Sequence, residues 1–310
     1  MKFPNIKISG LGYFLFYLVI VIFLLIGSLS EEKSEVKVGS VLPAVKVYKV
    51  EPVFSGEKEP PVFTAQSVYA LDIVSQKVLY DKNSSLPVLP ASTTKIITAL
   101  VALDYYPLDY ELTVGKLNID GQKMGLKEEE VITVDSLLKG LLIFSANDAA
   151  YVLADSYPGG YDLFISKMNM KAGELGLKDS YFLNPAGLDG VGQFTTAKDL
   201  AVLGTVSMEN DYIAKTVSLE KLDVYSTDGK IVHKLKNINE LIGKVDGVLG
   251  IKTGWTENAH ENLVTYINRD GKEIVIALLG SEDRFGETEN LINWIFDNYL
   301  WEAVETVENR

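Results

Sequence analysis

The apolar positions along the chain begin with one long uninterrupted run and continue in helical and alternating patterns. Residues 8–30 carry no charge, and residues 11–26 are almost wholly apolar, a length that spans a bilayer. Lysines precede this run and glutamates follow it, so the positive-inside rule places the N-terminus in the cytoplasm and the remaining chain outside. The pattern therefore predicts a transmembrane anchor over residues 1–30 and a location at the cell membrane.

A cleaved signal peptide is the alternative interpretation of this run. The run ends Ile26-Gly27-Ser28-Leu29-Ser30, without a clear small-x-small cleavage site, which favours an anchor. Both interpretations export the rest of the chain, so we expect the folded part to be extracytoplasmic, and secreted if the run is cleaved. Residues 31–61 mix charged residues with four prolines and predict a linker, in which residues 45–53 alternate enough to form an edge strand.

Residues 62–310 carry the patterns of one folded domain, with strands towards both ends and helices between them. Alternating stretches rich in β-formers predict a pair of strands within residues 65–80 and further strands over 217–224, 230–235, 262–268 and 273–279. Helical spacing predicts helices from about residue 92 to 103 and over 134–145, 149–176 with a break at 157–160, 195–208 and 287–307. This order favours an α+β fold in which helices flank one antiparallel sheet.

Composition narrows the chemistry that this domain can perform. The 310 residues include no cysteine, which excludes disulfides, thiolate metal sites and cysteine nucleophiles. The two histidines, His233 and His260, argue against a histidine-based metal cluster, so we expect neither a metal ion nor another cofactor. A net charge of −13 argues against nucleic acid as a partner.

One candidate nucleophile opens the most apolar helical stretch. Pro90-Ala91-Ser92-Thr93-Thr94-Lys95 leads directly into an apolar run, and residues three apart on a helix lie one above the other. A serine hydroxyl needs a neighbouring base, and a lysine in an apolar wall can lose its proton and serve as that base. Free backbone N–H groups at a helix start can hold a developing oxyanion.

Spacing alone does not establish this pair. Ser-x-x-Lys occurs six times in the chain, starting at residues 30, 34, 55, 92, 136 and 218. Of these, Ser92 is the serine that opens a strongly apolar helix, whereas Ser136 lies inside a predicted amphipathic helix. The assignment of Ser92 and Lys95 therefore depends on what the rest of the chain supplies.

Two further motifs carry suitable side chains. Ser145-Ala146-Asn147 follows an apolar helix and can supply a proton relay and a hydrogen-bond donor to a peptide carbonyl, or it is a plain helix cap. Lys252-Thr253-Gly254 lies in extended sequence, where a lysine and a threonine can bind a carboxylate. Gly254 would let another backbone approach closely, and a solvated edge strand is the alternative.

The three motifs in this order resemble those of penicillin-binding proteins and serine β-lactamases. Residues 69–80 are similar to the opening hairpin of the D-alanyl-D-alanine carboxypeptidases, and residues 90–95 resemble their nucleophile segment. Residues 184–189 and 195–200 resemble their connecting signature. The resemblance covers residues 62–301 and implies the penicillin-recognising fold, a five-stranded antiparallel sheet flanked by helices plus a helical lobe.

The resemblance also implies roles for individual residues in acyl transfer. Ser92 would attack the penultimate D-Ala carbonyl of a peptidoglycan stem peptide, and Lys95 would take its proton. The backbone N–H groups of Ser92 and Trp255 would hold the oxyanion, and Ser145 would pass a proton to the leaving D-Ala. β-Lactams would act as inhibitors that acylate Ser92.

The remaining motif residues would bind the substrate. The resemblance implies that Asn147 orients the stem peptide and that Lys252 and Thr253 bind its terminal carboxylate. Gly254 and Trp255 would line the same strand, beside which the substrate lies. The expected activity is that of a serine-type D-Ala-D-Ala carboxypeptidase.

Three related activities stay open from the sequence. A D,D-endopeptidase of the same family would cut cross-links instead of stem-peptide ends, and a non-enzymatic peptidoglycan sensor would acylate without turnover. A class A β-lactamase needs a deacylating glutamate, and residues 178–184, where it would lie, offer none. The sequence does not decide which base activates the deacylating water.

Overall fold

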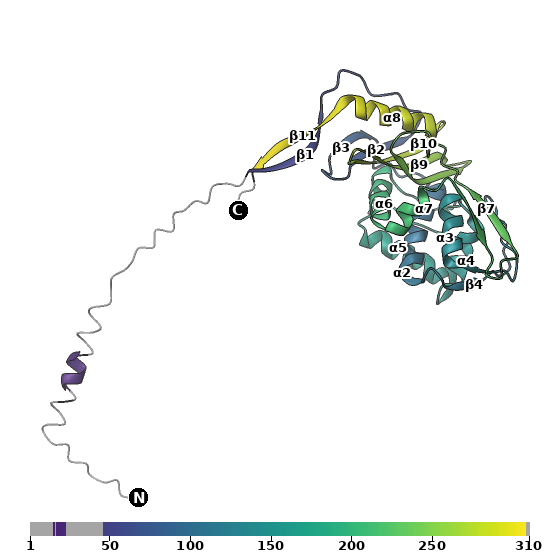
Figure 1. Cartoon of the computed structure of the whole chain (residues 1–310), viewed down its shortest axis with the longest axis horizontal. Coiled ribbons are helices and arrows are strands. Elements are labelled where there is room, and N and C mark those ends of the chain that lie inside the picture. The colour runs from purple at the N-terminus through teal and green to yellow at the C-terminus, as the bar shows by residue number, and fades with distance from the viewer. Residues whose placement is uncertain (1–14, 16, 23–45, 308–310) are drawn as a thin grey trace, which may run out of the picture. The chain divides into compact units, whose positions relative to one another are not determined.

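The computed structural model describes residues 15, 17–22 and 46–307, and its compact part is built around a five-stranded antiparallel sheet (Figure 1). The strand order is β3-β2-β10-β9-β8, so β8 is an edge strand. These strands are β2 (Ser67–Asp72), β3 (Val78–Lys82), β8 (Val248–Thr256), β9 (His260–Arg269) and β10 (Lys272–Ser281). The sheet and the helices around it confirm the predicted α+β fold class.

Both faces of the sheet are covered, as strand β10 shows most clearly. Its apolar run is buried on both faces, because alternate side chains of a strand point in opposite directions. Ile274, Ile276 and Leu278 pack in one cluster with apolar residues of α8 (Arg284–Asn298). The alternate set that begins at Val275 packs in a second cluster with the helices of the lobe. The main core therefore lies between the sheet and the lobe.

Helix α2 (Lys95–Tyr105) is the central helix of the lobe. Residues 95–102 are all buried, and the helix contacts α3, α4, α5 and α6. The surrounding helices are α3 (Val134–Ile143), α4 (Asn147–Asp155), α5 (Gly160–Glu174), α6 (Ala197–Glu209) and α7 (Asp211–Val217). A 3₁₀ turn, η1 (Ala91–Thr94), precedes α2, so the predicted buried helix is confirmed but its α-helical part begins at Lys95.

Two small two-stranded sheets border the lobe. They are formed by β4 (Glu111–Thr113) with β5 (Val131–Thr133) and by β6 (Lys221–Tyr225) with β7 (Val232–Lys236). The predicted strand over residues 217–224 is wrong at its start, because α7 ends at Val217. Asn210 explains the helix, since its side chain accepts hydrogen bonds from the backbone N–H groups of Tyr212 and Ile213.

The predicted closing helix over residues 287–307 is too long. Helix α8 ends at Asn298, and residues 299–307 form strand β11 (Tyr299–Val307), which pairs with β1 (Lys46–Phe54). The Asn298 side chain donates to the carbonyl of Trp294 and accepts from the N–H of Lys58, which ties the end of the helix to the segment after β1. Residues 299–307 form a strand because β1 is present to pair with them.

The contacts divide the chain into two units. One is compact and comprises Val47–Thr306, so it begins before residue 62, where the sequence predicts the start of the domain. The other comprises Met1–Lys46 with Val307–Arg310. Most of the predicted anchor lies outside the described residues. Among the residues that are described, no helix is long and apolar enough to cross a bilayer.

Candidate active site

The 3₁₀ turn before α2 brings the predicted nucleophile and base together. Lys95 is fully buried, and its Nζ lies 2.8 Å from the Oγ of Ser92, which is itself half-buried. The same Nζ donates to the carbonyl oxygen of Ala186 at 2.7 Å. The amine is therefore oriented by two partners, one of which is the hydroxyl that it would deprotonate.

The surroundings of Lys95 disfavour its charged form. Burial lowers the pKa of Lys95 well below its ordinary value, and the nearby charge of Lys252 lowers it further, while Asp148 raises it. A lysine amine without its proton is a base, whereas an ammonium is not. The site thus supplies the base that a serine nucleophile requires.

The second motif lies in the connection between α3 and α4. Ser145 has a positive φ of 62°, an uncommon conformation for a residue with a side chain. Its Oγ accepts a hydrogen bond of 2.8 Å from the Nζ of Lys252. The alternative of a plain helix cap is wrong, because the N-cap of α4 is Ala146, which makes no side-chain cap bond.

Asn147 has one half of its amide engaged and the other half free. Its Nδ2 donates to the carbonyl of Asp120 at 2.7 Å, and its backbone N–H donates to the carbonyl of Gln122. Its Oδ1 is buried and has no hydrogen-bond partner among the described residues. A buried acceptor without a donor costs free energy unless a ligand supplies one.

Asp148 fixes the loop of residues 124–126 through hydrogen bonds. It was not predicted as a site residue from the sequence. Its carboxylate accepts hydrogen bonds from the backbone N–H groups of Met124, Gly125 and Leu126 at 2.9–3.1 Å. With an exposed fraction of 2%, it is a buried charge that is satisfied by backbone donors. An aspartate that follows Ser145-x-Asn147 directly is the sequence signal that could have identified it.

The third motif lies on the edge strand β8. Lys252 is buried, and its Nζ donates to Ser145 Oγ and, at 3.0 Å, to the carbonyl of Thr253. Burial lowers the pKa of Lys252 to about 7, and the charge of Arg284 contributes to this shift. Lys252 is therefore poised to change its charge near neutral pH.

Gly254 is where β8 passes the nucleophile turn. A Cβ atom at this position would lie 3.1 Å from the backbone N of Ser92 and 3.1 Å from the Cβ of Ala91, so a larger residue would push the strand and the turn apart. The side chain of Asn262, on the neighbouring strand β9, donates to the carbonyls of Leu89 and Pro90 and fixes the turn there.

Trp255 is the predicted site residue with the most exposed side chain. Its exposed fraction is 62%, so its indole lies at the surface beside the third motif. The predicted role in the oxyanion hole concerns its backbone N–H alone.

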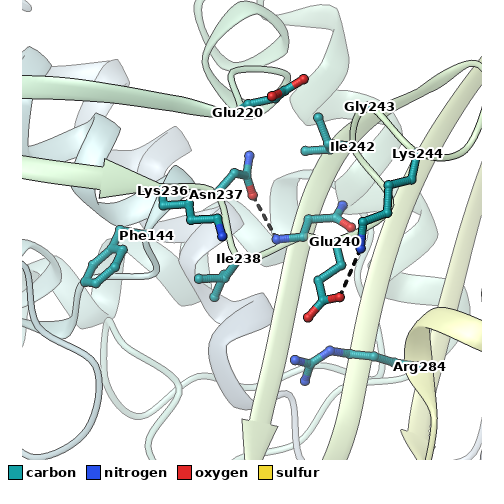
Figure 2. A pocket seen from close by; sticks show the side chains of 11 residues that line it. Phe144, Glu220, Lys236, Asn237, Ile238, Glu240, Ile242, Gly243, Lys244 and Arg284 are labelled. Carbon is teal, nitrogen blue, oxygen red and sulfur yellow. Dashed lines mark hydrogen bonds and ion pairs between the residues drawn. The ribbon is translucent and has the colours of Figure 1, made fainter.

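Arg284 belongs to the same region and was missed by sequence reasoning. Its Nη1 donates to the carbonyl of Gly254 at 3.1 Å, while its Nε is buried without a partner among the described residues. It lines a hollow of about 700 Å³ that also includes Phe144, the residue before Ser145 (Figure 2). No local motif marks this arginine, because the fold alone brings the start of α8 to β8.

A buried turn supports the base. Gln193 is 3% exposed, and its Oε1 accepts from the backbone N–H of Leu183 while its Nε2 donates to the carbonyl of Leu188. The Oδ1 of Asn184 accepts from three backbone N–H groups within the same turn. These bonds fix the turn that presents the carbonyl of Ala186 to Lys95, so the connecting signature of the sequence is part of the site.

The described residues contain no group of three or more histidine, cysteine, aspartate or glutamate side chains that could hold a metal ion. His233 instead pairs with Glu130 in the interior, with its Nε2 2.6 Å from Oε1. The serine–lysine chemistry described above needs no group from outside the chain.

Comparison with known proteins places this site in a family. A sequence model described as D-alanyl-D-alanine carboxypeptidase matches residues 55–283. The chain is 32% identical to the carboxypeptidase DacF of Bacillus subtilis over 76% of this chain and 63% of that protein. It is 34% identical to DacB2 of Mycobacterium tuberculosis over 78% of this chain and 86% of that protein. The matched part therefore spans less than two thirds of the Bacillus relative.

Solved structures of D-alanyl-D-alanine peptidases are similar to this chain as well. A D-alanyl-D-alanine carboxypeptidase from Mycobacterium tuberculosis superposes with a TM-score of 0.74 at 31% identity, covering 84% of this chain and 100% of that one. The Streptomyces K15 DD-transpeptidase gives a TM-score of 0.72 at 29% identity, covering 77% and 100%. Because the family match takes in the nucleophile turn, both buried lysines and the strand beside them, this chain belongs to the D-alanyl-D-alanine carboxypeptidase family.

Proposed function

We propose that this protein is a serine-type D-Ala-D-Ala carboxypeptidase that removes the terminal D-Ala from peptidoglycan stem peptides. The observation that carries the proposal is the buried Lys95 amine, 2.8 Å from the Ser92 hydroxyl, in surroundings that lower its pKa. Such an amine takes the proton of Ser92 as the Oγ attacks the carbonyl of the penultimate D-Ala. Family membership supports the same substrate class.

Acylation requires an oxyanion hole and a proton for the leaving amine. The backbone N–H groups of Ser92 and Trp255 are the donors that we propose, and the close approach of Gly254 to the Ser92 backbone supports this. As the scissile C–N bond breaks, the leaving amine takes a proton through Ser145, whose Oγ is held by Lys252. The products of this step are free D-Ala and an ester on Ser92.

Strand β8 carries the residues that bind the terminal carboxylate of the substrate. Lys252 and Thr253 lie on this edge, and Arg284 adds a third donor group whose Nε has no partner among the described residues. Asn147 Oδ1, also unpartnered there, accepts an N–H of the stem peptide. These groups bind a free-ended peptide that lies along β8, the edge strand of the sheet.

Hydrolysis of the ester completes the reaction. We assign Lys95 as the base for the deacylating water, because its amine lies against the Oγ that carries the acyl group. The nearby carboxylate of Asp148 already accepts hydrogen bonds from the backbone N–H groups of residues 124–126, so it is not assigned as this base. That geometry, and the lack of a glutamate in residues 178–184, favour a peptidase over a class A β-lactamase.

Two assays test the proposal together. The purified protein should release D-Ala from a D-Ala-D-Ala peptide and should form a stable adduct with a fluorescent penicillin, whereas Ser92→Ala should do neither. Ser136→Ala, which removes another Ser-x-x-Lys serine, serves as the matched control and should label normally. Equal labelling of Ser92→Ala and the wild type would refute the assignment of Ser92 as the nucleophile. An adduct that forms in the wild type without any release of D-Ala would favour the non-enzymatic peptidoglycan sensor.

We also propose that residues 1–30 anchor the protein in the cell membrane, with the catalytic unit outside. The support is the uncharged run of residues 8–30 between flanking lysines and glutamates. N-terminal sequencing of the exported protein should find the original N-terminus in the membrane fraction. A mature protein that starts directly after Ser28 or Ser30 would identify the run as a cleaved signal peptide.

A further inference from the structure

Two buried side chains outside the active site form a pair that the proposed reaction does not use. His233 lies on β7 and Glu130 directly precedes β5, and both are buried, with Nε2 of the first 2.6 Å from Oε1 of the second. The other oxygen of Glu130 accepts a hydrogen bond from the backbone N–H of Lys127. The other ring nitrogen of His233, Nδ1, lies 3.1 Å from the carbonyl oxygen of Met124. Both side chains therefore hold one loop, residues 120–127.

The geometry fixes which ring nitrogen of His233 donates to the loop. A carbonyl oxygen can only accept, so Nδ1 carries a hydrogen and donates it to Met124. One further hydrogen lies between Nε2 and the carboxyl oxygen of Glu130, because two acceptors 2.6 Å apart would repel each other. The bond to Glu130 thus keeps the ring in the orientation in which Nδ1 points at Met124.

The first two residues of α4 hold the same loop from the side of the active site. Asp148 accepts hydrogen bonds from three N–H groups of the loop, and the Nδ2 of Asn147 donates to the carbonyl of Asp120. The N–H of Met124 is bound to Asp148 while its carbonyl is bound to His233. The position of the loop therefore depends on β7 as well as on α4.

The loop decides which end of the Asn147 amide is left for a ligand. The carbonyl of Asp120 lies 2.7 Å from Nδ2 and would repel Oδ1 if the amide were reversed. The loop also passes close to this side chain, because a Cβ atom at Gly121 would lie 2.6 Å from the same Nδ2. Oδ1 has no partner among the described residues, which leaves it for an N–H of the stem peptide. A loop that moves away lets the amide turn, and the substrate loses a fixed acceptor.

We propose that His233 is a positioning residue for the substrate, because its bond to Met124 keeps the 120–127 loop against Asn147. Glu130 acts through His233 by orienting the ring. The chemistry at Ser92 is unchanged, so the contribution appears on substrates that carry the N–H that Asn147 binds. This inference rests on the proposed function, which assigns Oδ1 of Asn147 to the stem peptide.

The test uses the full chain and two substrates that differ in one group. The first is a D-Ala-D-Ala peptide, and the second is the depsipeptide in which an ester oxygen replaces the N–H of the penultimate residue, the N–H nearest to the scissile carbonyl. The scissile amide is the same in both. The measurement is kcat/KM for the release of D-Ala, and its ratio between the two substrates reports the bond to Oδ1 of Asn147.

Two variants of similar shape separate the two bonds of His233. In His233→Asn the amide nitrogen takes the place of Nδ1 and keeps the bond to Met124, whereas in His233→Gln it takes the place of Nε2 and keeps only the contact with Glu130. The matched control is Tyr299→Phe, which removes another buried hydrogen bond to a backbone carbonyl, that of Leu79, in the cluster on the other face of the sheet.

We expect the wild type to have a kcat/KM about tenfold higher for the peptide than for the depsipeptide, as one hydrogen bond to a buried acceptor would give. His233→Gln should reduce this ratio to about twofold through a loss on the peptide alone, whereas His233→Asn should keep it. Tyr299→Phe should lower Tm and leave the ratio unchanged. If His233→Gln does not fold, His233→Ser takes its place, since serine also lacks the donor to Met124.

Four outcomes would overturn the positioning role. They are equal kcat/KM for both substrates in the wild type, an equal loss on both substrates in His233→Gln, the same reduced ratio in His233→Asn, and the same reduced ratio in the control. Failure of the wild type to release D-Ala would instead refute the proposed function. Backbone hydrogen exchange over residues 120–127 then decides the inference, because faster exchange in His233→Gln than in His233→Asn supports it and equal exchange refutes it.

Discussion

Lys95 and Lys252 are both buried, yet their surroundings prepare them for opposite tasks. Lys95 contacts Ser92 and the carbonyl of Ala186, and its lowered pKa suits a base. Lys252 contacts Ser145, and its pKa of about 7 leaves it cationic on the acidic side of neutrality, where it can attract a carboxylate. A single substitution at either lysine therefore affects a different step.

The lowered pKa of Lys95 and the pKa of Lys252 together predict a bell-shaped pH profile of kcat/KM on a free-ended peptide. The rising limb follows the loss of the proton from Lys95, at a pH well below the ordinary lysine value. The falling limb lies above about pH 7, where Lys252 loses the charge that binds the carboxylate. A peptide with an amidated end should keep the rising limb and lose the falling one. Identical profiles for the two peptides would contradict this reading.

The elements that carry the site meet at β8, an edge strand with no strand partner on its outer side in the described sheet. Turn η1 lies against this strand at Gly254, and Asn262 on β9 ties the residues before the turn to the sheet. The turn from Asn184 to Gln193 contacts Lys95 through the carbonyl of Ala186, which accepts a hydrogen bond from the lysine Nζ. The nucleophile, the base and the binding strand are thus fixed by three separate elements.

The substitution Gln193→Met tests the supporting turn. It removes the hydrogen bonds to Leu183 and Leu188, so the carbonyl of Ala186 is no longer fixed against Lys95. That carbonyl stabilises the ammonium that Lys95 becomes, so its loss should move the rising limb to lower pH and slow penicillin acylation about tenfold. The measurement is the pH dependence of acylation.

Gln66→Met, at an exposed position, is the control for this substitution and should leave both values unchanged. Gln193→Glu keeps the acceptor for Leu183 and should recover part of the rate. A slower acylation with an unmoved limb would show that Gln193 stabilises the fold without positioning the base.

At the scale of the whole molecule, the two ends of the compact unit are joined. Strand β1 pairs with β11, and the ring of Phe54 contacts those of Trp294 and Tyr299 at centroid distances of 5.9 and 5.3 Å. These contacts connect residues before the catalytic part with residues after it. The unit is therefore larger than the part that carries the three motifs.

A truncation measures what this pairing contributes. A chain that starts at residue 62 lacks β1 and both ring contacts, whereas a chain that starts at residue 46 keeps them. Each aromatic contact is worth roughly 0.5–1.5 kcal/mol, and about 1 kcal/mol shifts Tm by some 2–4 °C in a domain of this size. We expect the shorter chain to melt about 5 °C lower, by calorimetry, with its penicillin labelling retained. Equal Tm values would show that β1 adds no stability.

The parts of the site that depend on local spacing could be predicted from the sequence. Ser92 and Lys95 meet because they lie three positions apart where the turn η1 enters a buried helix. The apolar runs in the sequences of β9 and β10 likewise indicate that these strands are buried. Those signals, with the order of the three motifs, were enough for the fold class and the family.

The distant groups that complete the site could not be predicted in this way, because they come together through the packing of the elements. Arg284 reaches Gly254 across a whole hairpin, and the partner that Lys95 finds in Ala186 is a backbone carbonyl, which every residue possesses. Residues 299–307 became a strand instead of the end of a helix because β1 was there to pair with them. Spacing along a chain reports which face of an element is buried, whereas the partner that buries it depends on how the elements pack.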